Sequence, residues 1–292
     1  MSIQSSFACL VCGDGDARLE LEDCKDYYLG KPFVVSYVRC ASCGLLQQHP
    51  LPSEIAAFYD DYPIHKQKSA LYRRLRDALL GALYFDVSQL AAGAAILDYG
   101  CGDGSFLAGV DGARNPRLGY EPNAEHAARL AAQLNIPVYS DADALVREQR
   151  GKLDAVTLHF VLEHLTDLHG AFARIAALLK PGGKLYIVVP DASSFEARLF
   201  GRFWHGLDPP RHISFPDRAG IDSLAARHGF TRITDRAVPF PNGIAGSIPA
   251  VVLGRFQVAL FALSMPIAVV ISRLAPSGAH AFCLKKPAAR SD

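Results

Sequence analysis

The spacing of hydrophobic positions changes near residue 94 of this 292-residue chain. Before that point, Leu71, Leu75, Leu79 and Leu83 recur every four residues, which predicts an amphipathic helix. After it, short apolar runs alternate with amphipathic stretches, which is typical of parallel strands joined by helices. The pattern predicts an α/β fold built on a doubly wound sheet of seven strands. The expected strands span 95–99, 117–120, 137–139, 155–159, 184–189, 231–238 and 281–285, and the expected helices span 105–109, 124–135, 168–179 and 217–228.

Two Cys-x-x-C pairs, each followed by glycine, mark a separate unit near the start of the chain. Two short strands are expected between the pairs, at 18–21 and 33–39. Four thiolates at this spacing favour a tetrahedral zinc ion in a zinc ribbon over 1–50, and two unrelated pairs of buried cysteines are the alternative. We expect a helical linker over 51–92 and one large domain over 93–292. The expected zinc ligands are Cys9, Cys12, Cys40 and Cys43, with Cys24 as a bystander.

The stretch after residue 95 carries the clearest chemistry. An apolar strand ends in Asp98 and continues through Gly100, Gly102 and Gly104 into a helix. Alternating glycines permit a tight turn and let a ligand approach the backbone. A dinucleotide site would have Gly-x-Gly-x-x-Gly, and an acid directly before the loop would repel a pyrophosphate. Asp98 suits a cationic, amino-acid-bearing cofactor, and Glu121, at the end of the next strand, suits the hydroxyls of a ribose.

These motifs resemble those of the class I S-adenosylmethionine-dependent methyltransferases over about residues 94–190. The segment Phe-Val-Leu-Glu-His-Leu at 160–165 and the turn Leu-Lys-Pro-Gly-Gly at 179–183 fit the same family. The resemblance implies a Rossmann-like fold, S-adenosylmethionine as cofactor, and Asp141 and Ala142 beside its adenine. An ordinary turn acid is the alternative for Asp141.

Three histidines are candidates for a general base, because a neutral imidazole accepts a proton near pH 7. His159 ends the fourth strand of the expected domain, at the carboxyl edge where ligands bind, so it is also a candidate for cofactor binding. The ribbon and the loop near residue 210 resemble the zinc-ribbon branch that includes nucleotide-sugar C-methyltransferases. That branch places histidines where His164 and His212 stand, although Pro209 and Arg211 replace its Tyr and Glu. A helix-start role for His164 and a loop-tethering role for His212 are the alternatives, and Arg211 could clamp an anion.

Hydropathy and charge are unevenly distributed. The mean hydropathy of +0.13 reflects in part an apolar segment over 244–272. The net charge of +1 combines −5 over residues 1–192 with +6 over 193–292. We expect the apolar segment to contact a membrane surface, with a helix pair that contacts a second copy of the chain or covers the substrate as the alternative. The start of the chain does not resemble a signal peptide, so we expect a cytoplasmic protein, either free or peripheral to the inner face of a membrane.

The combined expectation is an S-adenosylmethionine-dependent methyltransferase with a structural zinc ribbon. Its acceptor would be a small molecule, a sugar or a lipid-linked compound, methylated on carbon or oxygen. One alternative is an RNA base methyltransferase with a zinc module. Residues 7–46 hold four Lys and Arg against six Asp and Glu, so no nucleic-acid partner is expected. The other alternative is an inactive cofactor-binding scaffold.

Overall fold

The computed structural model describes residues 7–53, 58, 85–275 and 278–288. The predicted helix with leucines at 71–83, and most of the predicted linker over 51–92, lie outside these residues. The described end of that linker forms one turn of 3-10 helix, η4 (Val87–Gln89), capped by Asp86.

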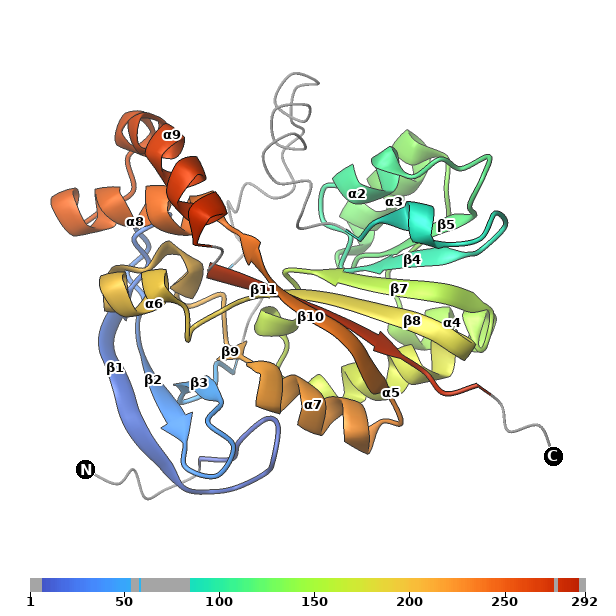
Figure 1. Cartoon of the computed structure of the whole chain (residues 1–292), viewed down its shortest axis with the longest axis horizontal. Coiled ribbons are helices and arrows are strands. Elements are labelled where there is room, and N and C mark those ends of the chain that lie inside the picture. The colour runs from blue at the N-terminus through green and yellow to red at the C-terminus, as the bar shows by residue number, and fades with distance from the viewer. Residues whose placement is uncertain (1–6, 54–57, 59–84, 276–277, 289–292) are drawn as a thin grey trace.

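A seven-stranded sheet forms the centre of the molecule, as the hydrophobic pattern predicted (Figure 1). In spatial order its strands are β10 (Thr231–Pro239), β11 (Gly278–Lys285), β8 (Leu179–Pro190), β7 (Leu153–His159), β4 (Ile96–Tyr99), β5 (Arg117–Tyr120) and β6 (Val138–Tyr139). The pairs from β8 through β6 are parallel, and β11 is antiparallel to both of its neighbours. All four residues of the inner strand β4 are buried, as is typical of a strand covered on both faces, and Asp98 is its one charged residue.

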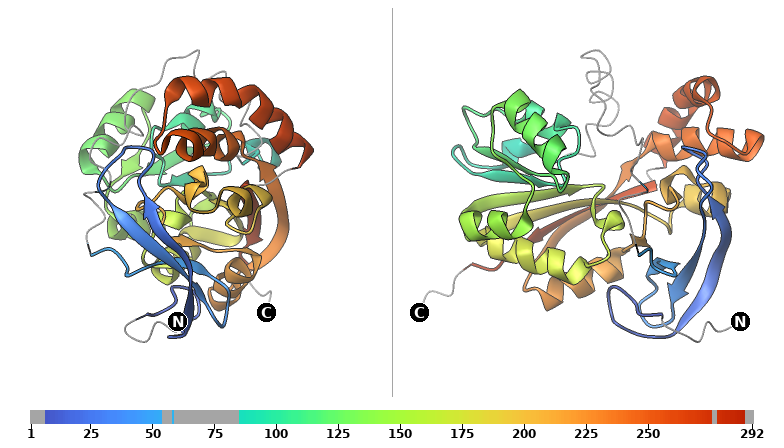
Figure 2. Two further views of the ribbon diagram at one scale, coloured as in Figure 1. Left: turned by 90° about the vertical axis from the view of Figure 1, so that its left-hand side faces the viewer. Right: turned by 180° about the vertical axis from the view of Figure 1, so that it is seen from behind.

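Helices cover both faces of this sheet (Figures 1 and 2). On one side lie α2 (Ser105–Gly109) and α3 (Ala124–Leu134), and on the other α5 (Leu168–Leu178) and α7 (Arg218–Arg227). The chain leaves β4 toward β5 on one side and later returns to β7 on the other. Ligands bind beyond the carboxyl ends of strands at such a reversal.

Polar side chains fix the starts of three of these helices. Asn123 accepts a hydrogen bond from the backbone N–H of His126 in α3, and Asp217 accepts one from Gly220 in α7. Asp141 caps α4 (Ala142–Gln149), a helix that the sequence analysis did not predict. This helix has one fully buried apolar side chain, Leu145, so its hydrophobic periodicity is weak.

A second, smaller sheet carries the N-terminal cysteines. It consists of β1 (Ala17–Lys25), β2 (Val34–Cys40), β3 (Leu46–His49) and β9 (Ser214–Phe215), in that order. Its fourth strand comes from the segment after His212, nearly 170 residues from β3, so the large domain completes the sheet. The unit predicted at 1–50 is therefore joined to the rest of the chain by backbone hydrogen bonds.

The apolar segment predicted at 244–272 forms a helical hairpin. Its two helices are α8 (Pro241–Leu253) and α9 (Val258–Leu274), separated by a left-handed turn at Gly254, where φ is 65°. The hairpin projects from the body of the molecule beside α6 (Phe195–Phe200) (Figure 1). Within the described residues, no helix combines the length and apolar character needed to cross a bilayer.

Candidate active site

The glycine loop lies directly after β4, at the reversal in strand order. Gly100, Gly102 and Gly104 all have positive φ, at 81°, 51° and 70°. A Cβ atom on Gly100 would lie 2.7 Å from Cγ2 of Val161, closer than side chains approach. The loop therefore requires glycine at position 100 both for its backbone conformation and for its contact with the chain after β7.

Asp98 is buried at the end of β4, where it accepts two hydrogen bonds. Thr157 donates from Oγ1 to its Oδ1 at 2.8 Å, and Nδ1 of His159 lies 3.1 Å from the same oxygen. The other ring nitrogen of His159 accepts from the backbone N–H of Phe85 at 3.3 Å. His159 was a candidate base, but in the structure both its ring nitrogens are engaged, and the side chain orients Asp98.

Glu121 lies at the carboxyl end of β5 and is 7% exposed. Its Oε1 accepts a hydrogen bond from the backbone N–H of Asn123 at 3.1 Å. Burial raises the pKa of this carboxyl. Among the described residues, neither Glu121 nor Asp98 forms an ion pair with a lysine or arginine. Two buried carboxylates beside a glycine loop fit a ligand that carries positive charge and hydroxyl groups.

A histidine that the sequence analysis missed supports the same loop. The buried ring of His126, on α3, donates from Nε2 to the carbonyl oxygen of Gly102 at 2.6 Å. Arg129 lies 3.3 Å from the other ring nitrogen, which fixes the tautomer. His126 lies in the first turn of α3, and nothing in the sequence distinguishes it there from a surface histidine.

Asp141 and Ala142, expected beside an adenine, lie after β6 at the same edge of the sheet. The Asp141 carboxylate accepts from the backbone N–H groups of Asp143 and Ala144 at 2.7 and 2.9 Å, which lowers its pKa. These contacts are those of a helix cap, and the side chain lies at the surface. An adenine contact at this position stays a prediction.

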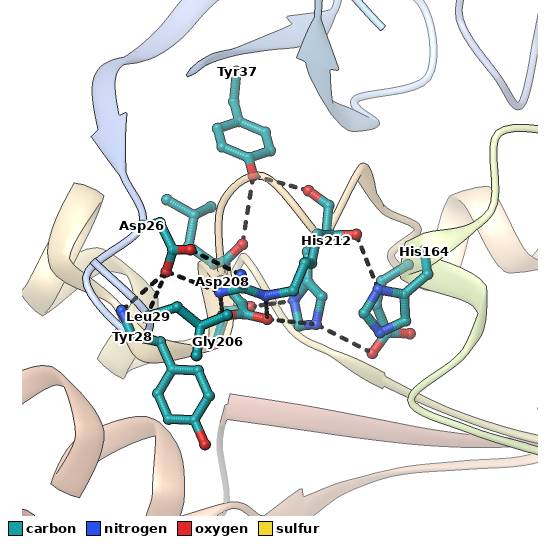
Figure 3. Close-up of polar contacts among 11 residues, drawn as sticks. Asp26, Tyr28, Leu29, Tyr37, His164, Gly206, Asp208 and His212 are labelled. Atoms are coloured by element: carbon teal, nitrogen blue, oxygen red, sulfur yellow. Dashed lines mark hydrogen bonds and ion pairs between the residues drawn. The ribbon is translucent and has the colours of Figure 1, made fainter. Parts of the chain in front are cut away.

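A second polar cluster lies beyond the end of β7 (Figure 3). It contains Glu163 and His164 of the 3-10 helix η5 (Leu162–His164) and His212 of the loop before β9. One ligand atom from each side chain lies within 4.8 Å of the others. Phe160, which leads into this cluster from β7, has a left-handed φ of 57°, a strained conformation for a bulky residue.

Both histidines of this cluster are oriented by backbone carbonyls. Nδ1 of His164 donates to the carbonyl oxygen of Arg211 at 2.9 Å, and Nδ1 of His212 donates to that of Gly206 at 2.8 Å. Burial lowers both pKa values, and burial together with the neighbouring His164 lowers that of His212 to about 3. Both rings are therefore neutral at pH 7, with a lone pair on Nε2.

Arg211 does not face this cluster with its guanidinium, although it was a candidate anion clamp. The guanidinium is fully buried between two carboxylates, Asp26 of the loop after β1 and Asp208 (Figure 3). It donates to Asp26 at 2.9 and 3.0 Å and to Asp208 at 2.9 and 2.6 Å. Although burial alone would raise it, the pKa of Asp208 is held at about 2 by Arg211. Arg211 therefore ties the N-terminal sheet to the loop that carries His212.

Tyr37 and Gln48 strengthen the same tie. The buried hydroxyl of Tyr37, on β2, donates to the carbonyl oxygen of His212 at 2.8 Å. The backbone N–H of Gln48 donates to the carbonyl oxygen of Ile213 at 2.7 Å, and Ile213 donates to the carbonyl oxygen of Glu163 at 2.6 Å. The N-terminal sheet thereby sets the position of both cluster segments.

The four predicted zinc ligands converge at the far end of the small sheet. Sγ of Cys9 lies 3.4 Å from that of Cys43, and Sγ of Cys12 lies 3.5 Å from that of Cys40. All four sulfur atoms lie within 4.8 Å of one another, and none forms a disulfide. This donor set fits a tetrahedral zinc ion. Cys24 is buried elsewhere, against Tyr37 and Trp204.

Comparison with known proteins shows which family this chain belongs to. The model of the methyltransferase domain family matches residues 65–234, which is more than half of the chain. The chain belongs to the methyltransferase domain family. The methyltransferase is 39% identical over 103 residues to a ubiquinone biosynthesis O-methyltransferase of Xanthomonas axonopodis, a stretch that covers 33% of this chain and 43% of that protein. The corresponding protein of Xanthomonas campestris is 37% identical over 102 residues, covering 32% and 42%. The chain thus spans less than half the length of these curated relatives.

Solved structures agree on the fold. A complex between the Haloferax volcanii Trm112 methyltransferase activator and a methyltransferase contains a chain that matches with a TM-score of 0.56 at 16% identity, covering 82% of this chain and all of that one. A SAM-dependent methyltransferase of Thermotoga maritima matches with a TM-score of 0.52 at 15% identity, covering 80% and 100%. At these identities the likeness shows the fold alone.

The buried ion pairs predict a large and specific loss of stability. Replacing Arg211 by leucine leaves Asp26 and Asp208 buried without their partner, and we expect the free energy of unfolding to fall by about 3–5 kcal/mol. The exposed Arg18, whose Nε lies 3.6 Å from Oε2 of Glu20, is the matched control, and Arg18→Leu should change stability by less than about 1 kcal/mol. Urea unfolding of both variants measures the difference, and equal losses would contradict a structural role for the buried pairs.

Proposed function

We propose that this methyltransferase uses S-adenosylmethionine and methylates a hydroxyl group of a small-molecule acceptor. Two buried carboxylates beside the glycine loop support the cofactor assignment most directly. Asp98 and Glu121 offer negative charge and hydrogen-bond acceptors to a ligand with a cationic amino acid end and a ribose, whereas a pyrophosphate would be repelled. Val161 leaves no room for a side chain at position 100, so such a ligand would meet backbone atoms there.

Each residue at this end would have a separate task. Glu121 would accept hydrogen bonds from the ribose hydroxyls, and Asp98, oriented by Thr157 and His159, would face the ammonium group. His126 would hold the carbonyl of Gly102 in place. When bound, S-adenosylmethionine supplies an electrophilic methyl group on a sulfonium ion, so the protein's contribution is alignment of the acceptor.

The cluster of Glu163, His164 and His212 is assigned to the acceptor end. Glu163 and His164 lie on the segment that follows Val161, and Val161 packs against Gly100 of the glycine loop, so the two ends would be neighbours. His212 or His164 would accept the acceptor's proton on Nε2, the atom that carries the lone pair in the observed tautomers. The stretch shared with the ubiquinone biosynthesis O-methyltransferases supports oxygen as the methylated atom. Sugar and lipid-linked acceptors stay predictions, as does transfer to carbon.

Glu121 provides the sharpest test of the cofactor assignment. Glu121→Gln keeps the shape of the side chain but removes its charge, and we expect affinity for S-adenosylmethionine to fall about 10- to 100-fold. Glu125→Gln, on an exposed carboxylate of α3, should leave affinity unchanged. Isothermal titration calorimetry measures both. Unchanged affinity in Glu121→Gln, or no binding to the wild type, would refute the assignment.

We further propose that the four cysteines hold a structural zinc ion in a reducing, cytoplasmic setting. Their sulfur positions support this, and the cysteines of the chain are all free thiols. The acidic composition of residues 7–46 favours a small-molecule acceptor over RNA. The zinc ion would stabilise the small sheet, which is hydrogen-bonded to the segment that carries His212.

Elemental analysis tests the zinc site. After dialysis against EDTA, the purified protein should retain one zinc per chain, because a closed four-thiolate site binds zinc very tightly. Cys12→Ser and Cys40→Ser should each lose the metal and much of the stability, whereas Cys24→Ala should retain zinc. Absence of zinc from the wild type would rule out the site, and its retention in both serine variants would do the same.

A further inference from the structure

We propose that Glu163, His164 and His212 form a binding site for a divalent metal ion that holds the acceptor. The ligand atoms come from two segments, η5 and the loop before β9, and all lie within 4.8 Å of one another. A bound ion would draw these atoms together by small side-chain movements. This inference rests on the proposed function, since it names how the same cluster would recognise its acceptor.

The histidines are arranged as metal-ligating histidines usually are. A ligating imidazole typically donates its distal N–H to a carbonyl or carboxylate, which fixes the ring and directs the other nitrogen to the metal. Both rings do this, toward the carbonyl oxygens of Arg211 and Gly206.

Glu163 provides a second observation, independent of the two histidines, that points to a bound ion. Its side chain is fully buried, and neither carboxylate oxygen has a hydrogen-bond partner within the described residues. Nε2 of His212 lies 3.9 Å from its Oε1. A buried carboxyl group without a hydrogen-bond partner is costly, so such groups in native proteins commonly have a function or an ion that satisfies them. A cation held between the two imidazole rings and Glu163 would give the Glu163 carboxyl group a partner.

The chemistry of these three side chains limits which metal ion and which acceptor could bind. Two imidazoles and one carboxylate leave coordination positions open and suit manganese, iron, cobalt or zinc. The neighbouring Asp208, 4.0 Å from Nε2 of His212, is already paired with Arg211 and would remain outside the ligand set. The open positions fit an acceptor with one hydroxyl or two adjacent hydroxyls.

With the ion in place, proton removal needs no histidine base. The coordinated hydroxyl would release its proton to solvent, because a divalent ion lowers the pKa of a bound O–H group. The oxygen lone pair would then form the new bond to the methyl carbon as the carbon–sulfur bond breaks, leaving a neutral thioether.

Manganese binding tests the site without an activity assay. Electron paramagnetic resonance of free Mn²⁺, titrated into the zinc-containing protein, should show one saturable site per chain. Glu163→Gln and His212→Gln should each weaken binding at least about 10-fold. His228→Gln, at the end of α7, is the matched control and should bind like the wild type. Manganese should also raise the melting temperature of the wild type but not of Glu163→Gln.

Two results would overturn the metal site: no saturable Mn²⁺ binding, or equal affinity in the wild type and Glu163→Gln. Calorimetry with S-adenosylmethionine on the same samples separates this failure from failure of the proposed function. If S-adenosylmethionine binds and manganese does not, only the metal site is refuted and the histidine base stands. If S-adenosylmethionine does not bind, the proposed function fails.

A separate observation supports a second proposal: the α8–α9 hairpin rests on a lipid bilayer that contains anionic lipids. Large apolar side chains of α9 are widely exposed, with Val258 at 71%, Leu263 at 77% and Leu274 at 82%. Arg255 and Arg273 are exposed beside them, and residues 236–291 contain no Asp or Glu. Apolar residues beside exposed arginines suit an anionic membrane surface, whereas a self-contact would bring these like charges together.

Vesicle flotation tests the hairpin. The full chain should float with vesicles of phosphatidylcholine and phosphatidylglycerol and less with phosphatidylcholine alone. Leu263→Ser combined with Ile267→Ser should abolish flotation, whereas Ile233→Ser, an exposed residue of β10, should not. Absence of flotation would refute the proposal. A dimer by light scattering that the double variant abolishes, without vesicle binding, would assign the surface to a second copy instead.

Discussion

The buried guanidinium of Arg211 is the interaction on which the candidate site depends. It joins Asp26, from the N-terminal sheet, to Asp208, in the loop before β9. The same residue's carbonyl oxygen orients His164, and the next residue is His212. A pair of buried charges contributes little net stability against an apolar alternative, but it strongly disfavours any arrangement that separates the partners. Its effect is therefore to fix one register between two segments more than 180 residues apart.

This tie explains why the N-terminal unit is built into the methyltransferase rather than attached to it. The glycine loop, Asp98 and Glu121 come from the sheet alone and need nothing from the small sheet. The cluster of Glu163, His164 and His212 depends on the small sheet, because β9 pairs with β3 and Tyr37 holds the backbone of His212. The glycine loop and the cluster of Glu163, His164 and His212 are thus supported by different parts of the chain. Strained backbone at Phe160 and Asp208, where φ is 57° and 37°, lies close in sequence to the residues of this cluster.

Local patterns predicted the sheet well, because buried parallel strands are continuous apolar runs and helix starts carry capping residues. The cysteine pairs and the glycine loop were also visible as spacing. The sequence did not reveal which remote segments pair with one another. No periodicity links Asp26 to Arg211, so an arginine in a polar loop suggested an anion clamp. His159 stood at a strand end suited to catalysis, yet the backbone of Phe85 engages its second nitrogen. The short strands β3 and β9 gave no signal because pairing, not hydrophobicity, defines them.

The central claim is that the cofactor end and the Glu163, His164 and His212 cluster face one shared space. Carbon-13 relaxation of S-adenosylmethionine labelled in its methyl group, measured with Mn²⁺ on the protein, tests this directly. Paramagnetic relaxation falls steeply with distance, so the account predicts strong enhancement at the methyl carbon in the wild type and none in Glu163→Gln. A bound cofactor and a bound ion with no enhancement would contradict it.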